Sequence, residues 1–319
     1  MVIRMVRRVF RLALPALLAI GVGAQTLPRA ATFRASTQMV LVPVTVIDHD
    51  GRVVTGLQAK DFSLFDDQAP QRIVSFGTQD ARCSAGLVLD VSGSMQTTLG
   101  AVKDSAQVFV RTSNQDDEFL LLTVSTLPAV SPEFTSDAGA VEESISATRP
   151  GGYTALIDTV YLGLNQMKKA RNPQRALVIV SDGMDNHSRY SKGELLRVAL
   201  EADVQIYTVI IDNGAGGSTP NGVPFRPSMI SKPGDQAAAR QGPSLLEEIA
   251  EKTGGLSFHA RNAAEAREGM MKISQALRNE YVLGYQPAES ELSGKLHRLR
   301  VKSTLPKVHV HARSSYYAP

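Results

Sequence analysis

The sequence predicts an α/β protein: a doubly wound, mostly parallel sheet with helices on both faces, plus a small flanking β module from the N- and C-terminal segments. Between about residues 85 and 277, short apolar runs alternate with amphipathic stretches of helical period. Strands that alternate with helices are typical of parallel sheets joined by crossover helices. On either side of this region, apolar and polar residues alternate with a period of two, which is typical of half-buried strands.

The first residues of the chain resemble a secretory signal peptide. A leader with four arginines is followed by an apolar run at 12–23 and by small residues that suit cleavage after Ala24. The apolar run is short for a membrane span, so an uncleaved anchor is the less favoured alternative and would be the chain's only contact with a membrane. We therefore expect an exported protein, either periplasmic or extracellular.

Composition excludes several classes of function. The chain has 319 residues, of which 43% are hydrophobic and 20% charged, as in ordinary globular proteins. Because the leader contains four arginines and no acidic residue, its removal changes the formal charge from +3 to −1. No basic field then remains to favour nucleic acid as a partner. Cys83 is the only cysteine, so no intramolecular disulfide forms, and we expect this thiol to be buried as a small apolar residue.

The N-terminal β segment is predicted from short runs rich in valine and phenylalanine. A strand at 39–47 is followed by an Asp-Gly turn and a short return strand, and Pro43 predicts that the first of these lies at a sheet edge. A second pair, 62–65 and 73–76, flanks a turn at 66–68. Since a short sheet is marginal alone, we expect this segment to pair with the C-terminal one.

The central region supplies the strands and helices of the parallel sheet. Its expected strands are 85–90, 118–124, 175–181, 204–211 and 256–259, and its expected helices are 99–112, 137–147, 156–170, 192–201, 244–252 and 263–277. The C-terminal segment adds strands at 281–285, 296–303 and 307–313. These patterns divide the chain into a signal peptide at 1–24, a linker at 25–37, a β segment at 38–80, an α/β domain at 81–279 and a β segment at 280–319.

One glycine- and proline-rich segment, 212–242, predicts a long mobile loop. It follows a strand of the central sheet, so we expect it to emerge at the carboxyl edge. Our hypothesis is that it borders a binding face where Arg226, Lys232 or Arg240 helps to hold an acidic ligand. An insertion without any role is the alternative.

Oxygen-bearing side chains cluster at the predicted strand ends. Asp90, Ser92 and Ser94 come directly at the end of the first central strand, and Asp182 follows the third. Thr154 stands behind Gly-Gly-Tyr where a helix is expected to begin. In such folds ligands lie at the carboxyl ends of the strands, so these side chains are expected to meet.

The donor set indicates a hard dication. Every donated atom is an oxygen, and the small number of carboxylates suits Mg²⁺, with Mn²⁺ or Ca²⁺ as alternatives. Zinc or copper would favour histidine or cysteine at these positions. The sequence therefore predicts a magnesium site at the edge of the sheet.

The order and spacing of these residues resemble the metal-ion-dependent adhesion site of von Willebrand factor A domains, with all of its positions filled. The resemblance implies that Ser92, Ser94 and Thr154 ligate the metal as neutral groups, and that Asp90 and Asp182 hold it directly or through water. It implies an open coordination position that a Glu or Asp of a protein partner completes. The leader and the order of β, α/β and β segments are similar to those of the bacterial exported family called VWFA-related proteins, so we expect a von Willebrand A-like fold.

Other chemistry is less well supported. Ser92 or Ser94 as a hydrolase nucleophile would need a base such as His187, and the Gly-x-Ser-x-Gly elbow is missing. No Walker motif is present, and the glycines at 214–219 lack the pattern and the following helix of a dinucleotide site. His309 and His311 share a predicted strand face without a third ligand in view. We expect a non-enzymatic, cation-dependent binding module; a metal-assisted hydrolase and a purely structural A domain are the alternatives.

Overall fold

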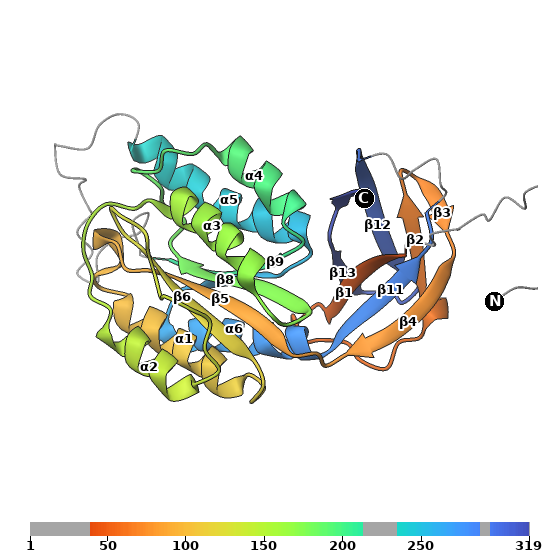
Figure 1. The fold of residues 1–319 in the computed structure, drawn as a ribbon, viewed down its shortest axis with the longest axis horizontal. Coiled ribbons are helices and arrows are strands. Elements are labelled where there is room, and N and C mark those ends of the chain that lie inside the picture. The colour runs from red at the N-terminus through yellow and green to blue at the C-terminus, as the bar shows by residue number, and fades with distance from the viewer. Residues whose placement is uncertain (1–38, 213–234, 288–293, 319) are drawn as a thin grey trace, which may run out of the picture. The chain divides into compact units, whose positions relative to one another are not determined.

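The computed structural model describes residues 39–212, 235–287 and 294–318, and residues 38–319 form one compact unit. The signal peptide and linker expected at 1–37 lie outside the described residues. Two parts are visible within the unit, an α/β domain and a β module (Figure 1). No helix among the described residues has the length and apolar character that a membrane crossing requires.

The α/β domain is built on a six-stranded sheet with the order β10-β9-β8-β5-β6-β7. The pairs that join β10 to β9, β9 to β8, β8 to β5 and β5 to β6 are parallel, and only the edge strand β7 is antiparallel. The strands are β5 (Cys83–Asp90), β6 (Glu118–Val124), β7 (Ala129–Val130), β8 (Gln174–Ser181), β9 (Gln205–Ile211) and β10 (Ser257–Ala260). The predicted doubly wound fold is therefore confirmed.

Helices cover both faces of this sheet, as Figure 1 shows. They are α1 (Leu99–Thr112), α2 (Ala138–Ala147), α3 (Leu156–Gln166, continued by the 3₁₀ turn Met167–Lys169), α4 (Lys192–Glu201), α5 (Asp235–Thr253) and α6 (Ala263–Arg278). Apolar side chains of α1, α2 and α6 pack in one core cluster, and those of α3, α4 and α5 pack in another. Side chains alternate along a strand, so Leu87 and Leu89 of β5 enter the first cluster and Val88 enters the second.

Local signals fix where several helices begin. The side chain of Asp137 accepts a hydrogen bond from the amide of Ala140 at 3.0 Å and caps α2. Ser191 and Glu194 form a reciprocal capping box at the start of α4. Such caps satisfy amides that have no partner inside the helix and so favour these starting positions.

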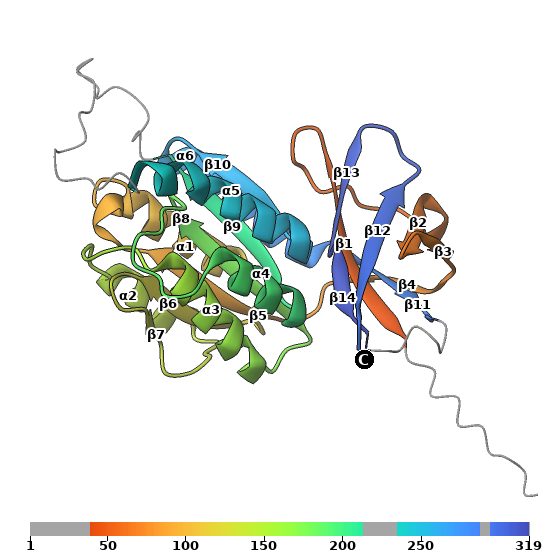
Figure 2. The ribbon, with the colours of Figure 1, turned by 90° about the horizontal axis from the view of Figure 1, so that it is seen from above.

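The β module interleaves the two ends of the chain (Figure 2). One sheet has the order β13-β1-β11-β4 and the other β14-β12-β2-β3. Their strands are β1 (Val40–Asp48), β2 (Phe62–Asp66), β3 (Ala69–Gln71), β4 (Ile73–Gln79), β11 (Glu280–Tyr285), β12 (Leu296–Ser303), β13 (Val308–Ala312) and β14 (Ser315–Tyr317). A third apolar cluster fills the module. The expected pairing of the N- and C-terminal segments is thus present, and it completes the confirmed fold class.

Two expectations about this module were wrong. The strand that contains Pro43 is not an edge strand, because β1 has β13 on one side and β11 on the other. However, β13 pairs with β1 only from Val44 onwards, so Pro43 has β11 as its single neighbouring strand. The missing amide of Pro43 therefore removes no hydrogen bond between β1 and β13. The strand at 73–76 also has a different partner: β2 pairs with the short β3, whereas β4 pairs with β11.

Smaller differences concern the start of α5 and some short strands. The predicted loop at 212–242 is helical from Asp235, where α5 begins, and residues 213–234 lie outside the described part. Strands β3, β7 and β14 were not predicted, because two or three residues are too few to show a period. The remaining central elements begin and end within a few residues of their predicted positions.

Candidate metal site at the carboxyl edge of the central sheet

Asp90 is the last residue of β5 and is fully buried. Its Oδ1 accepts the amide of Ser92 at 3.0 Å, and its Oδ2 accepts the hydroxyl of Ser181 at 2.5 Å. The hydroxyl oxygens of Ser92 and Ser94 lie 3.1 Å apart. The turn that follows β5 therefore gathers a carboxylate and two hydroxyls, with Ser92 buried and Ser94 exposed.

Backbone hydrogen bonds attach the loop before Thr154 to this turn. The amide of Gly151 donates to the carbonyl of Val91 at 2.8 Å, and the amide of Gly93 donates to the carbonyl of Gly152 at 3.0 Å. Gly152 has φ +81°, and a Cβ there would collide with the hydroxyl of Thr126. Glycine is therefore required where the two loops meet.

The loop after β8 closes the site from the other side. The carbonyl of Thr154 accepts the amides of Asn186 and His187 at 3.0 and 3.1 Å, and the amide of Thr154 donates to Oδ1 of Asn186 at 2.9 Å. Asp182 precedes this loop, is 7% exposed, and its Oδ1 accepts the amide of Met184 at 2.9 Å. The three loops that carry Asp90, Thr154 and Asp182 are thus in contact.

The pKa of the Asp90 carboxyl reflects its burial and the nearby carboxylate of Asp182. Burial raises the pKa of its carboxyl to about 6, hydrogen bonds from Ser181 and Ser92 lower it, and the charge of Asp182 raises it further. The largest influences on this pKa are burial, the two serines and Asp182. Two neighbouring carboxylates in a buried position are stabilised by a bound dication, and the surrounding donors are all oxygens, so these residues fit a hard metal ion.

A family comparison identifies the domain that carries these loops. Residues 86–184 match the family model of the von Willebrand factor type A domain. The chain contains a von Willebrand factor A domain. The match includes Asp90, Thr154 and Asp182. No curated protein matches the sequence.

Several solved structures are similar to this chain at low sequence identity. A von Willebrand factor type A protein from Catenulispora acidiphila is 11% identical with a TM-score of 0.50, covering 89% of this chain and 75% of that one. An aerotolerance-related membrane protein from Bacteroides fragilis is 17% identical with a TM-score of 0.46, over 61% of this chain and 98% of that one. The von Willebrand domain of the type V pili tip protein Mfa5 from Porphyromonas gingivalis is 14% identical with a TM-score of 0.47, over 62% and 95%.

The rim of the A domain beside Thr154 carries exposed side chains. Tyr153 is 62% exposed and its ring stacks on that of His187, with centroids 5.1 Å apart. Among the described residues, no hydrogen bond links His187 to Ser92. His187 therefore lies in the loop as expected, and its ring contacts a tyrosine instead of a nucleophile.

Other predicted residues lie away from this edge or outside the described part. Arg226 and Lys232 lie outside it, as does the side chain of Arg240. His309 and His311 lie on β13 in the β module; burial lowers the pKa of His311, whereas His309 is exposed.

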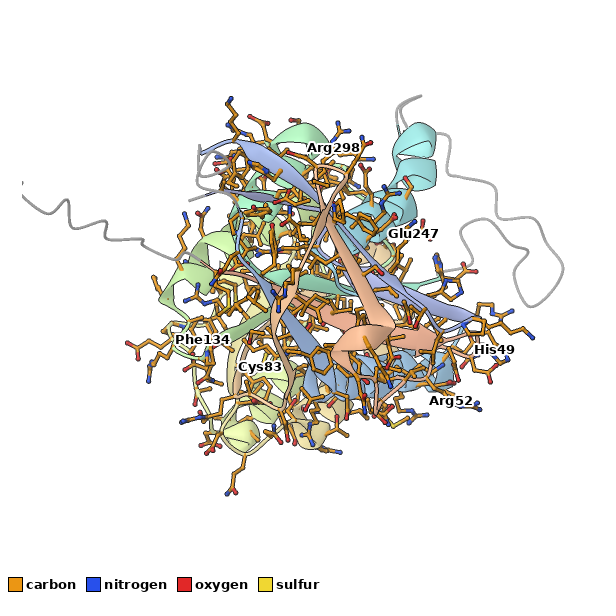
Figure 3. All side chains as sticks on the ribbon, turned by 90° about the vertical axis from the view of Figure 1, so that its right-hand side faces the viewer. His49, Arg52, Cys83, Phe134, Glu247 and Arg298 are labelled. Carbon is orange, nitrogen blue, oxygen red and sulfur yellow. The ribbon has the colours of Figure 1, made fainter. Side chains whose placement is uncertain are left out.

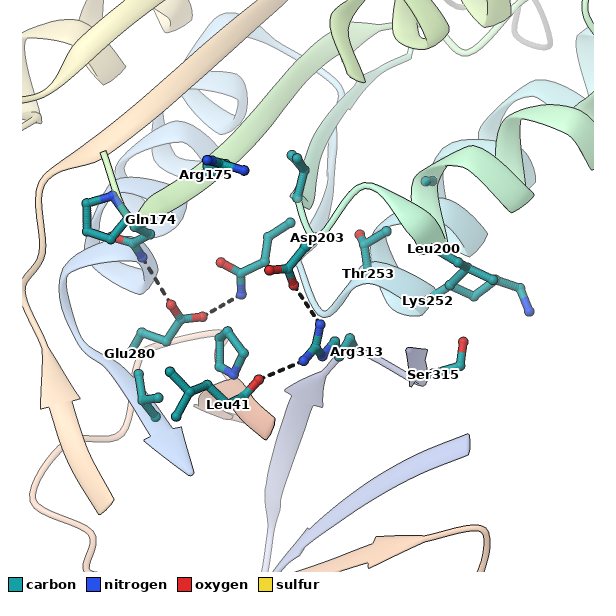
Figure 4. A pocket seen from close by; sticks show the side chains of 16 residues that line it. Leu41, Gln174, Arg175, Leu200, Asp203, Lys252, Thr253, Glu280, Arg313 and Ser315 are labelled. Carbon is teal, nitrogen blue, oxygen red and sulfur yellow. Dashed lines mark hydrogen bonds and ion pairs between the residues drawn. The ribbon is translucent and has the colours of Figure 1, made fainter. Parts of the chain in front are cut away.

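A pocket by contrast lies at the opposite end of the sheet (Figure 4). It has a volume of about 190 Å³, and Gln174 and Gln205, the first residues of β8 and β9, line it with Glu280. Glu280 accepts hydrogen bonds from both glutamine side chains, and burial raises its pKa to about 7. Sequence reasoning missed this group, because nothing in its local pattern marks a glutamate at the start of a strand as buried.

Proposed function

We propose that the chain is an exported binding module of the adhesion type, which captures an acidic side chain of a partner protein through a divalent cation. Mg²⁺ is the preferred ion, with Mn²⁺ or Ca²⁺ as alternatives. Ser92, Ser94 and Thr154 would hold the ion directly, and Asp90 and Asp182 would hold it directly or through water. A Glu or Asp of the partner would complete the coordination.

The buried carboxyl of Asp90 is the observation that carries this proposal. Its pKa is raised to about 6 by burial and by the charge of Asp182, and its main hydrogen-bond donors are the neutral groups of Ser181 and Ser92. Burying a carboxylate beside another one is unfavourable unless a cation is bound. An ion at this position would relieve both carboxylates at once.

The neutral donors explain why an acidic partner would bind. Three of the five proposed ligands are hydroxyls, which bring no charge to the ion. The remaining carboxylates also share their oxygens with protein donors, such as the amide of Ser92 and the hydroxyl of Ser181 on Asp90. A dication held this way keeps electrostatic attraction for one more anion, which a partner's carboxylate supplies.

The exposed rim supports recognition of a protein rather than of a small ion alone. Tyr153, stacked on His187, stands next to Thr154, and its amide donates to the hydroxyl of Thr126, the neighbour of the 71% exposed Leu127. Exposed aromatic and aliphatic side chains beside a polar site are typical of protein-binding surfaces.

The experiment is a selection from a random peptide library on the mature protein, with Mg²⁺ and with EDTA. The expected binders are enriched in Asp or Glu, and they are lost when EDTA removes the ion. Replacing the essential acidic residue of a selected peptide by its amide should weaken binding at least about 100-fold, since a charged ligand is then lost.

Thr154→Val is the matching change in the protein. Its control is Thr159→Val, at a second buried threonine that lies within α3. We expect Thr154→Val to weaken peptide binding about 10-fold or more while Thr159→Val leaves it unchanged. Binders that ignore EDTA, or equal losses in both variants, would contradict the proposal. Metal-dependent turnover of ester or phosphate substrates that Ser92→Ala abolishes would favour a hydrolase instead.

A further inference from the structure

A second group of potential metal ligands lies in the β module, away from the A domain's edge. Asp66 ends β2, Asp67 stands in the turn to β3, and His297 lies in β12, which pairs with β2. Asp66 is 1% and His297 7% exposed, whereas Asp67 is exposed to solvent. The three ligand atoms lie within 4.8 Å of one another.

The contacts of His297 do not have the form of an ordinary ion pair. Its Nδ1 lies 3.3 Å from Oδ1 of Asp66 and 3.1 Å from Oδ2 of Asp67, yet it makes a hydrogen bond with neither. Oδ1 of Asp66 is likewise buried without a hydrogen-bond partner. Neither oxygen therefore lies where a proton on Nδ1 would form a hydrogen bond with it.

The spacing fits three ligands of one metal ion. Zinc–nitrogen and zinc–oxygen bonds of about 2.0–2.2 Å place neighbouring ligands of a tetrahedral site about 3.3 Å apart. The two distances from Nδ1 are close to this value. A histidine nitrogen with two carboxylate oxygens is also the donor set of a zinc-class ion and not of magnesium.

The other oxygen of each carboxylate is already held by the protein. Oδ2 of Asp66 accepts the hydroxyls of Tyr285 at 2.6 Å and Tyr316 at 3.0 Å. Oδ1 of Asp67 accepts the amide of Arg298 at 2.9 Å. Such outer contacts orient metal ligands, and here they leave one oxygen of each carboxylate directed at the imidazole.

We propose that Asp66, Asp67 and His297 form a second metal site, specific for a zinc-class transition dication, which joins the β2–β3 turn to β12. The exposed Asp67 leaves the site open to solvent on one side, so water completes the coordination. Because the ligands come from the N- and C-terminal β segments, the ion stabilises the closure of the module. This proposal does not depend on the function proposed for the A domain.

A second acidic group in the β module provides a control. Asp48, His49 and Asp50 also lie close together, but all are at least partly exposed, and Arg52 already pairs with Asp50 at 2.7 Å. His49 and Arg298, the neighbour of His297, lie well apart in Figure 3. A cation at Asp48, His49 and Asp50 would be held by partly or fully exposed side chains and would compete with Arg52 for Asp50.

The test is a titration of the metal-free mature protein with Zn²⁺ in saturating Mg²⁺, together with the visible spectrum after Co²⁺ is added. We expect one zinc per chain, a melting temperature raised by about 5 °C at 100-fold excess over the Kd, and the intense visible bands of tetrahedral Co²⁺. Asp67→Asn, at an exposed position that should not disturb folding, should weaken zinc binding at least about 100-fold, and His297→Gln should abolish the cobalt bands.

The remaining variants distinguish this site from the Asp48–Asp50 group and from the proposed metal site in the A domain. Tyr285→Phe should weaken zinc binding about 10-fold, because it removes an outer contact. His49→Gln and Asp90→Asn should retain both the zinc affinity and the cobalt bands. Zinc binding that Asp67→Asn leaves unchanged, or that His49→Gln abolishes, would overturn the proposal. Absence of zinc binding to the wild-type protein would show that Asp66, Asp67 and His297 form an ion pair only.

Discussion

Asp90 illustrates how a single residue combines a structural cost with a proposed function. As the final residue of a fully buried strand it has lost its water, and burial raises the pKa of its carboxyl to about 6. Two neutral serine donors satisfy its oxygens without compensating its charge. A group of this kind destabilises the ion-free fold and is stabilised by a bound cation.

Replacing this carboxyl by its amide tests that reasoning. We expect Mg²⁺ to raise the melting temperature of the wild-type protein but not that of Asp90→Asn, while the ion-free variant is at least as stable as the ion-free wild type. Differential scanning fluorimetry with and without Mg²⁺ measures both.

Asp117→Asn is the matched control. Asp117 is 7% exposed, its Oδ1 accepts the amide of Cys83 at the opposite end of β5, and burial also raises its pKa. This variant should keep the full response to Mg²⁺. If Asp90→Asn responds to the ion as the wild type does, Asp90 is not part of a metal site.

The separation of residues along the chain decided which residues of the two proposed metal sites could be predicted. Asp90, Ser92 and Ser94 lie within five residues of one another, and their order along the chain is itself a recognisable pattern. Asp67 and His297 belong to segments that are more than two hundred residues apart, and each is unremarkable within its own segment. Only the pairing of β12 with β2 brings them together.

At the scale of elements, Glu280 shows how three strand ends share one buried group. It begins β11 directly after α6, and it accepts hydrogen bonds from Gln174 at the start of β8 and Gln205 at the start of β9. Burial raises its pKa from 4.5 to about 7, and the two glutamine donors lower it. The neutral carboxyl is therefore the form that the fold prefers.

This preference predicts a pH dependence of stability. The contribution of the neutral carboxyl is fully present below about pH 4.5 and is lost as the pH rises through about 7, because the unfolded chain ionises more readily. Between pH 4.5 and 8 the wild type should lose about 3 kcal/mol relative to Glu280→Gln.

Urea unfolding of both proteins at pH 5 and pH 8 measures the difference. Glu133→Gln, at an exposed position, should follow the wild type at both values. Parallel pH profiles for Glu280→Gln and the wild type would show that Glu280 ionises as freely in the folded protein as in the unfolded one.

Helices and strands with a clear apolar periodicity were predicted well, whereas the pairing of strands in the β module was not. The strands and helices of the central sheet have apolar periods that a short window reveals, and buried parallel strands read as apolar runs. Strand pairing in the module depends on residues far apart in the chain, so β4 was assigned to the wrong partner and Pro43 to a sheet edge. Glycine and proline near residue 242 similarly concealed the start of α5 at Asp235.

On the scale of the whole molecule, the two β segments enclose the A domain in sequence and pair with each other in space. Arg313 of the C-terminal segment connects both parts: it pairs with Asp203 of the A domain at 2.6 Å and donates to the carbonyl of Leu41 in β1 at 2.7 Å. Glu280 lies at the same junction, whereas Asp90 is the last residue of β5, at the opposite edge of the central sheet. The edge that would face a partner is thus opposite the β module.

The central claim is that Ser92, Ser94 and Thr154 coordinate one dication that Asp90 and Asp182 help to neutralise. The most direct measurement is the anomalous difference map of crystals soaked in Mn²⁺, since manganese replaces magnesium and scatters anomalously. We predict a strong peak within bonding distance of the three hydroxyl oxygens, absent from crystals of Asp90→Asn. A map without density there, or a structure in which these side chains diverge around water alone, would contradict the account.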